Sequence, residues 1–367
     1  VNIRASLDAG LTYPYLLVAD TPNDGTESVV LPGVAGNTAA RIMVESTNEF
    51  CGVHFFDVSD ESFTITAGGD VVAPTAEPDC TAPPPAPQGP FESLSPQRFV
   101  DTRPSPIGAT LDGLFEGAGK LSAGEEYRVT ITGRGEVPVG AKAVVMNITA
   151  IATEGVGFVT VHPCVSPLPL ASSLNYTPGV NLGNEIVAPL TDTGEVCIYT
   201  DDAAHIAVDV VGYVDADSTT EPVTPARFLD TRPDGETFDD IAEKSGKLTD
   251  NETVFLPVAG RGSVPVDAVA VIVNVTAVAA ERTGYITVDP CAQEVPLASS
   301  LNYVTGVNRG NEIIASIDNE GDICLFTSAP VHLTADVVGY LPSGTELSTI
   351  APARFLDTRP APDGDTI

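Results

Sequence analysis

The sequence of 367 residues contains no tryptophan and few cations, with 17 lysines and arginines against 50 aspartates and glutamates. The formal net charge of −33 argues against nucleic acid or an anionic lipid surface as a partner, because both attract clustered cations. No run of eighteen apolar residues occurs, so we expect no membrane-spanning helix. The first residues lack a basic segment followed by an apolar one, which we interpret as the start of a mature or trimmed chain.

Signatures of catalysis are missing as well. The sequence has no nucleophile elbow, no glycine-rich phosphate loop and no cluster of metal ligands. A glycosidase needs only two carboxylates, but the 50 acidic residues offer no pair to single out. We therefore expect a protein that is not an enzyme, with no catalytic residues and no cofactor.

Calcium is the one metal with candidate ligands. The loop at residues 20–27 carries hard oxygen ligands on Asp20, Asn23, Asp24 and Glu27, and a second acidic loop lies at residues 234–240. Neither loop follows the spacing of a known calcium loop. We interpret both as exposed turns and keep calcium binding as the weaker alternative.

What the sequence does contain is internal repetition. The segment Arg-Phe-Val-Asp-Thr-Arg-Pro at 98–104 returns as Arg-Phe-Leu-Asp-Thr-Arg-Pro at 227–233 and at 354–360. Ser-Ser-Leu-Asn-Tyr at 172–176 recurs at 299–303, an offset of 127 residues, and Asp-Val-Val-Gly-Tyr recurs after the same interval. A constant offset over a hundred residues indicates two copies of one domain.

The repeats divide the chain into six segments. The prediction is an N-terminal β domain at 1–80, in which a degenerate repeat is one interpretation, a proline-rich linker at 81–94, repeat 1 at 95–214, a linker at 215–223, repeat 2 at 224–341, and a linker with the opening strand of an incomplete third repeat at 342–367.

The fold class follows from the spacing of prolines and glycines and from the alternation of apolar and polar residues between them. The 31 prolines and 33 glycines recur at short intervals and separate brief runs rich in valine, isoleucine, threonine and tyrosine. Helical periodicity is not sustained anywhere. We expect all-β domains, most simply sandwiches of seven or eight strands with a barrel as the alternative, arranged as beads on a string.

The six cysteines fall into three spaced pairs, namely Cys51 with Cys80, Cys164 with Cys197, and Cys291 with Cys324. The last two pairs occupy equivalent repeat positions, and none has the short knuckle spacing of a zinc site. We therefore predict one disulfide per domain. Disulfides indicate an oxidising compartment, so the predicted location is extracellular or the cell surface.

The charged residues of the repeated motif are predicted to be structural. Asp101 and Arg103, like Asp230 and Arg232, lie between apolar positions, where an unpaired charge would be costly. Their candidate partners are each other, or two aspartates of the closing segment. Those aspartates are Asp209 and Asp336. The alternative is an arginine that binds a ligand.

Four asparagines satisfy the glycosylation sequon, at positions 147, 175, 251 and 274. Two of them lie in the most apolar runs, where asparagine more simply bonds to the backbone. Asn175 and Asn251 are the better candidates for a glycan.

The motifs of residues 96–214 and 225–341 resemble the tandem repeats of secreted proteins from actinobacteria and related environmental bacteria. Those repeats open with an Arg-Phe-Leu-Asp-Thr-Arg segment, continue through a Gly-Arg-Gly turn, and close with Asp-Val-x-Gly-Tyr. The resemblance implies accessory or structural modules of exported proteins. It brings no catalytic residues with it.

The sequence therefore predicts a structural or adhesive protein of a cell-surface layer, stalk or filament, whose partner is a further copy of itself or a cell-surface or glycan ligand. Residues 351–367 carry the motif without a domain behind it, which suggests polymerisation by strand donation. The alternative function is a carbohydrate- or protein-binding accessory module of a larger secreted protein.

Overall fold

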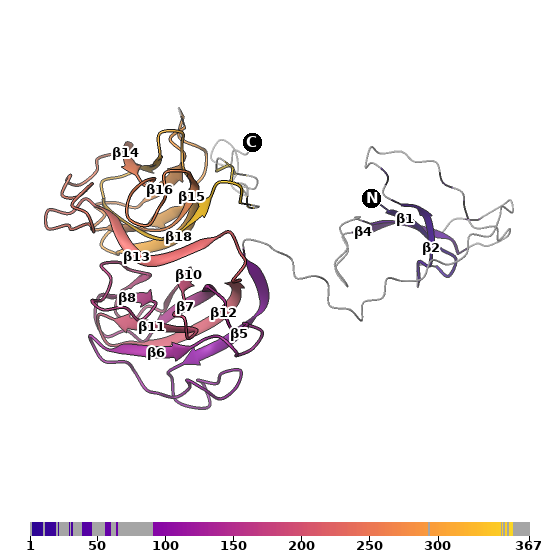
Figure 1. Ribbon diagram of the computed structural model, residues 1–367, viewed down its shortest axis with the longest axis horizontal. Coiled ribbons are helices and arrows are strands. Elements are labelled where there is room, and N and C mark those ends of the chain that lie inside the picture. The colour runs from indigo at the N-terminus through magenta and orange to yellow at the C-terminus, as the bar shows by residue number, and fades with distance from the viewer. Residues whose placement is uncertain are drawn as a thin grey trace. The chain divides into compact units, whose positions relative to one another are not determined.

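The computed structural model describes residues 2–9, 12–19, 21, 29, 31, 39–45, 56–59, 64, 91–292, 294–345, 347, 349–350 and 352–354. The chain divides into two compact units, Val1–Pro87 and Gln88–Ile367 (Figure 1). Every strand in the described residues belongs to an antiparallel sheet, and none of these residues lies in a helix. The expected all-β class is confirmed.

The first unit contains one four-stranded antiparallel sheet with the strand order β2-β1-β3-β4. Its strands are β1 (Asn2–Ser6), β2 (Tyr15–Val18), β3 (Arg41–Glu45) and β4 (Phe56–Val58). Ile3 and Ala5 of the central strand β1 are buried. The sheet agrees with the β character expected of residues 1–80, within the residues described.

Repeat 1 consists of two four-stranded sheets with the orders β10-β7-β12-β5 and β6-β11-β8-β9. The strands are β5 (Glu92–Asp101), β6 (Glu126–Thr130), β7 (Ala143–Ile151), β8 (Gly157–His162), β9 (Leu174–Tyr176), β10 (Leu182–Pro189), β11 (Glu195–Thr200) and β12 (His205–Val214).

Repeat 2 has the same topology, with the sheet orders β13-β20-β15-β18 and β14-β19-β16-β17. The strands are β13 (Glu221–Asp230), β14 (Glu252–Pro257), β15 (Ala268–Val278), β16 (Gly284–Asp289), β17 (Leu301–Tyr303), β18 (Arg309–Ser316), β19 (Asp322–Thr327) and β20 (His332–Pro342).

Strand alternation decides which residues form the core of each repeat. In β7, Met146 and Ile148 are fully buried, while Asn147 and Thr149 point to the opposite face and are only partly buried. The buried residues of both sheets join in one cluster. Because repeat 2 has an equivalent cluster, each repeat is a sandwich of two sheets around its own core.

Disulfides join equivalent positions of the two repeats. Cys164 pairs with Cys197, and Cys291 pairs with Cys324, with Cα atoms 4.9 Å and 4.8 Å apart. In each case the bond ties the loop after the fourth strand of the repeat to a strand of the second sheet. Two of the three predicted pairs are thus present. Cys51 and Cys80 lie outside the described residues.

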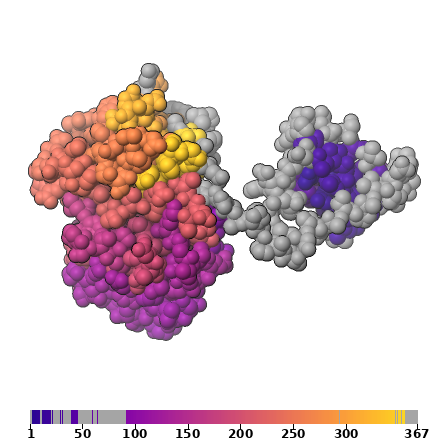
Figure 2. Space-filling view, viewed as in Figure 1, coloured from indigo at the N-terminus to yellow at the C-terminus, as the bar shows by residue number. Residues whose placement is uncertain are grey.

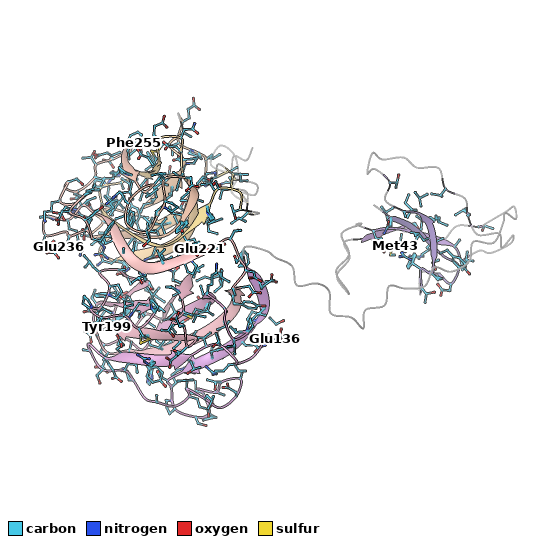
Figure 3. The ribbon with its side chains drawn as sticks, viewed as in Figure 1. Met43, Glu136, Tyr199, Glu221, Glu236 and Phe255 are labelled. Carbon is cyan, nitrogen blue, oxygen red and sulfur yellow. A yellow bond between two sulfur atoms is a disulfide. The ribbon has the colours of Figure 1, made fainter. Side chains whose placement is uncertain are left out.

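The domain boundaries differ from the predicted ones because strands begin inside the predicted linkers. β5 starts at Glu92, within 81–94. β13 starts at Glu221, within 215–223, and Figure 3 labels this residue. Only six residues, 215–220, separate β12 from β13. Lys142 of repeat 1 holds this connection, since its Nζ donates to Ser218 O at 2.9 Å and to Glu221 at 3.0 Å.

The beads-on-a-string expectation needs correction for the two repeats. They follow each other along the chain as predicted, but Gln88–Ile367 is one compact unit in which repeat 1 contacts repeat 2 directly. Six residues span at most about 20 Å, which keeps the repeats close. The space-filling view shows the magenta and orange surfaces meeting along a boundary (Figure 2).

Candidate functional site: the interface between the repeats

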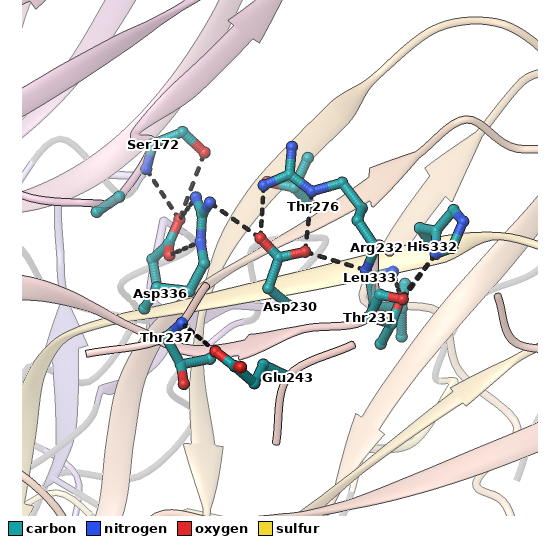
Figure 4. A network of polar contacts seen from close by, with 12 residues as sticks. Ser172, Asp230, Thr231, Arg232, Thr237, Glu243, Thr276, His332, Leu333 and Asp336 are labelled. Carbon is teal, nitrogen blue, oxygen red and sulfur yellow. Dashed lines mark hydrogen bonds and ion pairs between the residues drawn. The ribbon is translucent and has the colours of Figure 1, made fainter. Parts of the chain in front are cut away.

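The repeated motif builds a charge network on the outer face of repeat 2. Arg227 donates two hydrogen bonds to the Asp336 carboxylate, from Nε at 2.8 Å and from Nη2 at 3.1 Å. Arg232 donates to the Asp230 carboxylate in the same way, from Nε at 2.8 Å and from Nη2 at 2.5 Å. A third contact, from Arg227 to Asp230 at 3.4 Å, joins the two pairs into one network (Figure 4).

The same network exists in repeat 1. Arg98 donates to both carboxylate oxygens of Asp209, at 2.8 Å and 2.9 Å, and also to Asp101 at 2.9 Å. Arg103 pairs with Asp101 at 2.9 Å and 2.6 Å. The pairing of the second motif arginine with the motif aspartate matches the prediction for a structural ion pair.

Sequence reasoning missed one partner of each network. The closing-strand aspartates Asp209 and Asp336 pair with the first arginine of the motif, Arg98 or Arg227, and not with the second. The signal was present, because that first arginine recurs in all three copies of the motif. The predicted residues are thus brought together, but around an arginine that the prediction left out.

The network lowers the pKa of its central carboxyl groups. Burial would raise the pKa of Asp230, but hydrogen bonds from the Arg232 side chain and backbone, together with the charges of Arg232 and Arg227, outweigh burial. The same balance lowers the pKa of Asp101 in repeat 1. Both carboxyl groups are therefore ionised at neutral pH, as members of structural ion pairs should be.

A second repeated arginine was also missed. Arg134, in the Gly-Arg-Gly turn, donates to both carboxylate oxygens of Asp112 and to Phe99 O at 3.0 Å. Its guanidinium lies 4.7 Å from the centre of the Phe99 ring. Gly135 adopts a positive φ of 53°, which lets the turn close around the arginine. Arg261 makes the equivalent contacts in repeat 2, so this is a structural element of each sandwich.

Repeat 1 docks on the outer face of repeat 2 through four residues, which we call the docking edge. They are Ser172, Asn175, Asn184 and Val187. The residues of repeat 2 that they meet form the receiving face. These are Asn274, Thr276, Glu312 and Asp336.

Polar contacts at the centre of this interface involve the charge network itself. The backbone N–H of Ser172 donates to Asp336 Oδ2 at 2.8 Å (Figure 4). Asn274 donates its side-chain amide to Ser172 O and accepts from Asn184 at 3.3 Å. Asn175 donates to Thr276 Oγ1 at 3.3 Å. Asp336 and Asn274 are fully buried as a result.

An apolar contact and a carboxyl group complete the interface. Val187 packs against an outer cluster of repeat 2 that includes Ile272 and Val338. Its backbone N–H, on the edge strand β10, donates to Glu312 Oε1 at 2.6 Å. Burial raises the pKa of Glu312 to about 8, the bond from Val187 lowers it in part, and the nearby charge of Glu185 adds to the increase.

A groove of about 430 Å³ lies beside the polar contacts. Its lining combines Phe158 and Leu170 of repeat 1 with Arg232 and Thr334 of repeat 2. The Thr334 hydroxyl is buried and has no hydrogen-bond partner among the described residues. The groove therefore combines an apolar wall with polar groups at the junction of two repeats.

The remaining predicted sites have separate outcomes. Asn175 belongs to the docking edge, so a glycan on its amide would displace repeat 1 from repeat 2. Asn251 is exposed in a turn before β14 and stays a candidate for glycosylation.

The calcium candidates at residues 20–27 lie outside the described residues, as does most of the segment 351–367 predicted to donate a strand. Within the described residues, no group of three or more His, Cys, Asp or Glu could hold a metal ion.

In the part of the chain that the structure describes, no helix is long and apolar enough to cross a membrane.

Comparisons with known proteins identify no family. No family model matches the chain, and no curated protein matches it either. Among solved structures, the extracellular domain of ANXUR1 from Arabidopsis thaliana is similar over 68% of this chain and 90% of that chain, at 9% identity and a TM-score of 0.22. A similarity at this level supports no inference about function. The resemblance to bacterial tandem repeats stays a prediction.

Proposed function

We propose that the protein is a non-enzymatic structural or adhesive protein of the cell exterior, in which repeated β-sandwiches are held in a fixed relative position. It serves as a subunit or segment of a surface layer, stalk or filament. The observation that carries this proposal is the interface, where residues common to both repeats hold one repeat on the next.

The repeated motif supports this role by orienting one carboxylate. Arg227 comes from the opening segment of repeat 2 and Asp336 from its closing strand, and their two parallel hydrogen bonds fix the Asp336 carboxylate. The Asp336 Oδ2 atom is then positioned to accept the Ser172 N–H of the preceding repeat. The motif thus sets the geometry of an array and does not supply reactive chemistry.

Covalent bonds and surface charge fit the same setting. Each repeat has its own disulfide, and disulfides persist in oxidising compartments outside the cytosol. The net charge of −33 keeps such a protein soluble through mutual repulsion. These features support an extracellular location.

Hydrogen exchange of the full chain tests the fixed arrangement, read by mass spectrometry on short overlapping peptides. The N–H groups of Ser172 and Val187 donate across the interface, so we expect them to exchange as slowly as strand-interior amides. Their counterparts Ser299 and Ile314 are internal controls, because no such bond to another repeat reaches them within the described residues. If all four amides exchange equally fast, the repeats are not held together and the proposal is wrong.

The groove favours a second candidate function, the accessory module that binds carbohydrate or protein. An apolar wall with Phe158, beside Arg232 and the unpartnered hydroxyl of Thr334, suits a hydroxyl-rich ligand such as a sugar. A glycan array probed with the full chain tests it. Reproducible binding that is lost in Thr334→Val would favour this function, and an array without hits would eliminate it for the glycans printed.

A further inference from the structure

Each repeat carries both halves of the interface, and only one copy of each half is used within the described residues. The docking edge of repeat 1 and the receiving face of repeat 2 are engaged. At an offset of 127 residues the sequence holds a second docking edge on repeat 2, formed by Ser299, Asn302, Asn311 and Ile314. It also holds a second receiving face on repeat 1, formed by Asn147, Thr149, Glu185 and Asp209.

The second copies keep the chemistry of the first. Seven of the eight positions have the same residue type in both repeats, and the eighth exchanges Val187 for the similar Ile314. Their burial differs. Asp336 has a fully buried side chain and Asp209 is 27% exposed, while the exposed fraction rises from 8% for Arg227 to 34% for Arg98. Ser172 is buried, whereas Ser299 is exposed.

The free receiving face already has the geometry of the engaged one. Arg98 fixes the Asp209 carboxylate with two bonds of 2.8 Å and 2.9 Å, as Arg227 fixes Asp336. Asn147 donates to Thr149 Oγ1 at 3.2 Å, a local bond on the same face. The carboxylate is therefore positioned for an N–H donor before any partner arrives.

The free docking edge is also preformed. Asn302 donates to Ser299 Oγ at 3.3 Å, the same distance as from Asn175 to Ser172 Oγ in the engaged copy. Asn311 donates to Ser300 O at 2.9 Å, which matches the bond from Asn184 to Ser173 O at 2.8 Å. Because neither half needs to rearrange, association loses little free energy to ordering.

We propose that the receiving face of repeat 1 takes the docking edge of repeat 2 from a second copy of this chain, so that molecules associate head to tail. This inference rests on the proposed function, because it reuses the interface between the repeats. The two halves are different surfaces, so the contact is heterologous and leaves one free half at each end. Such a contact repeats from copy to copy in one direction, and gives an open filament where its rotation does not close into a ring.

Salt should promote this association. Each chain has a net charge of −33, and approaching copies repel each other unless that charge is screened. The screening length falls from about 30 Å at 0.01 M to about 3 Å at 1 M ionic strength. Within one chain the short connection between the repeats offsets the repulsion, whereas two copies have no such connection.

The experiment is sedimentation velocity of the full chain over a range of protein and salt concentrations, with two surface variants. Asn302→Arg obstructs the free docking edge, and Thr149→Arg obstructs the free receiving face. We expect the unmodified chain to form a concentration-dependent series of oligomers that grows with salt. For each variant alone, the association constant should fall by roughly tenfold or more relative to the unmodified chain, as expected for loss of a central contact.

Mixing the two variants gives the sharper result. Each variant retains the half that the other has lost, so the mixture should form one-to-one dimers and stop there. A face-to-face contact between like surfaces would not show this pattern. A chain that stays monomeric at every concentration and salt, or variants that polymerise as readily as the unmodified chain, would overturn the inference.

Hydrogen exchange in the same samples separates this inference from the proposed function. Protected amides at Ser172 and Val187 in a chain that stays monomeric would mean that the fixed arrangement holds and head-to-tail association does not occur. Slow exchange at Ser299 in that monomer would show that another part of the same chain covers the docking edge, which also contradicts the inference.

Discussion

β7 and β15 occupy the same place in the two repeats, yet their surroundings differ. In β7 burial alternates, with Met146 and Ile148 buried and Asn147 and Thr149 partly exposed. In β15 it does not alternate, because repeat 1 covers the outer face and buries Asn274. The same residue types thus belong to a free face in one repeat and to an interface in the other. The neighbour, and not the motif, determines how much each contact stabilises the protein.

The largest expected difference is at the closing-strand aspartates. Asp336→Asn leaves Arg227 buried beside a neutral group, and removing one partner of a buried pair costs about 3–5 kcal/mol. Asp209→Asn breaks the partly exposed counterpart and should cost at most about 1 kcal/mol. Urea unfolding of the two full-length variants measures both. Equal losses would mean that the interface does not bury the network.

The disulfides should behave alike in the two repeats, since neither contributes to the interface contacts described. Each closes a loop of 33 residues, and its removal should cost roughly 3–4 kcal/mol. The double replacements Cys164→Ser with Cys197→Ser, and Cys291→Ser with Cys324→Ser, test this by urea unfolding. A loss confined to one repeat would contradict the equivalence of the two domains.

Glu312 gives the interface between the repeats a pH dependence. Its pKa is about 8 in the folded chain against 4.5 for an ordinary glutamate, so the folded state holds the proton more tightly. The stabilisation is complete below pH 4.5 and is lost as pH rises to about 8, by at most about 1.4 kcal/mol per pH unit.

Unfolding measured from pH 4 to 9 checks this dependence. Glu312→Gln should flatten the decline, because the neutral amide has no proton to lose. Glu185→Gln, at the equivalent exposed position of repeat 1, removes a negative charge that raises the pKa of Glu312. It should therefore shift the decline slightly toward lower pH. An unchanged profile in Glu312→Gln would show that another group is responsible.

The smallest expected effect is at the asparagines of the two docking edges. Asn175→Ala removes a hydrogen bond to Thr276 across the interface and should cost about 1 kcal/mol. Asn302→Ala removes only the local bond to Ser299 and should cost a few tenths of that value. Thermal unfolding of both variants measures the difference. A larger loss for Asn302 would reverse the assignment of engaged and free edges.

Several features could be predicted from the sequence because they depend on neighbours along the chain or on the repeat itself. Valine-rich runs between prolines and glycines predicted strands, and the equal spacing of two cysteine pairs predicted their bonding. The motif aspartates and arginines were correctly expected to pair. The first motif arginine was not included, because strand pairing brings Arg98 to Asp209 over 111 residues.

The sequence alone determined the repeat, the strand pattern and the residues that point outward, since these follow from covalent order and from the two-residue period of a strand. Only the tertiary structure decided what covers each outer face. Asn147 and Asn274 have the same local sequence pattern, but only Asn274 meets a neighbouring repeat. Burial depends on which surfaces come together in space, and two segments with the same residue pattern do not by themselves show which of them a neighbour covers.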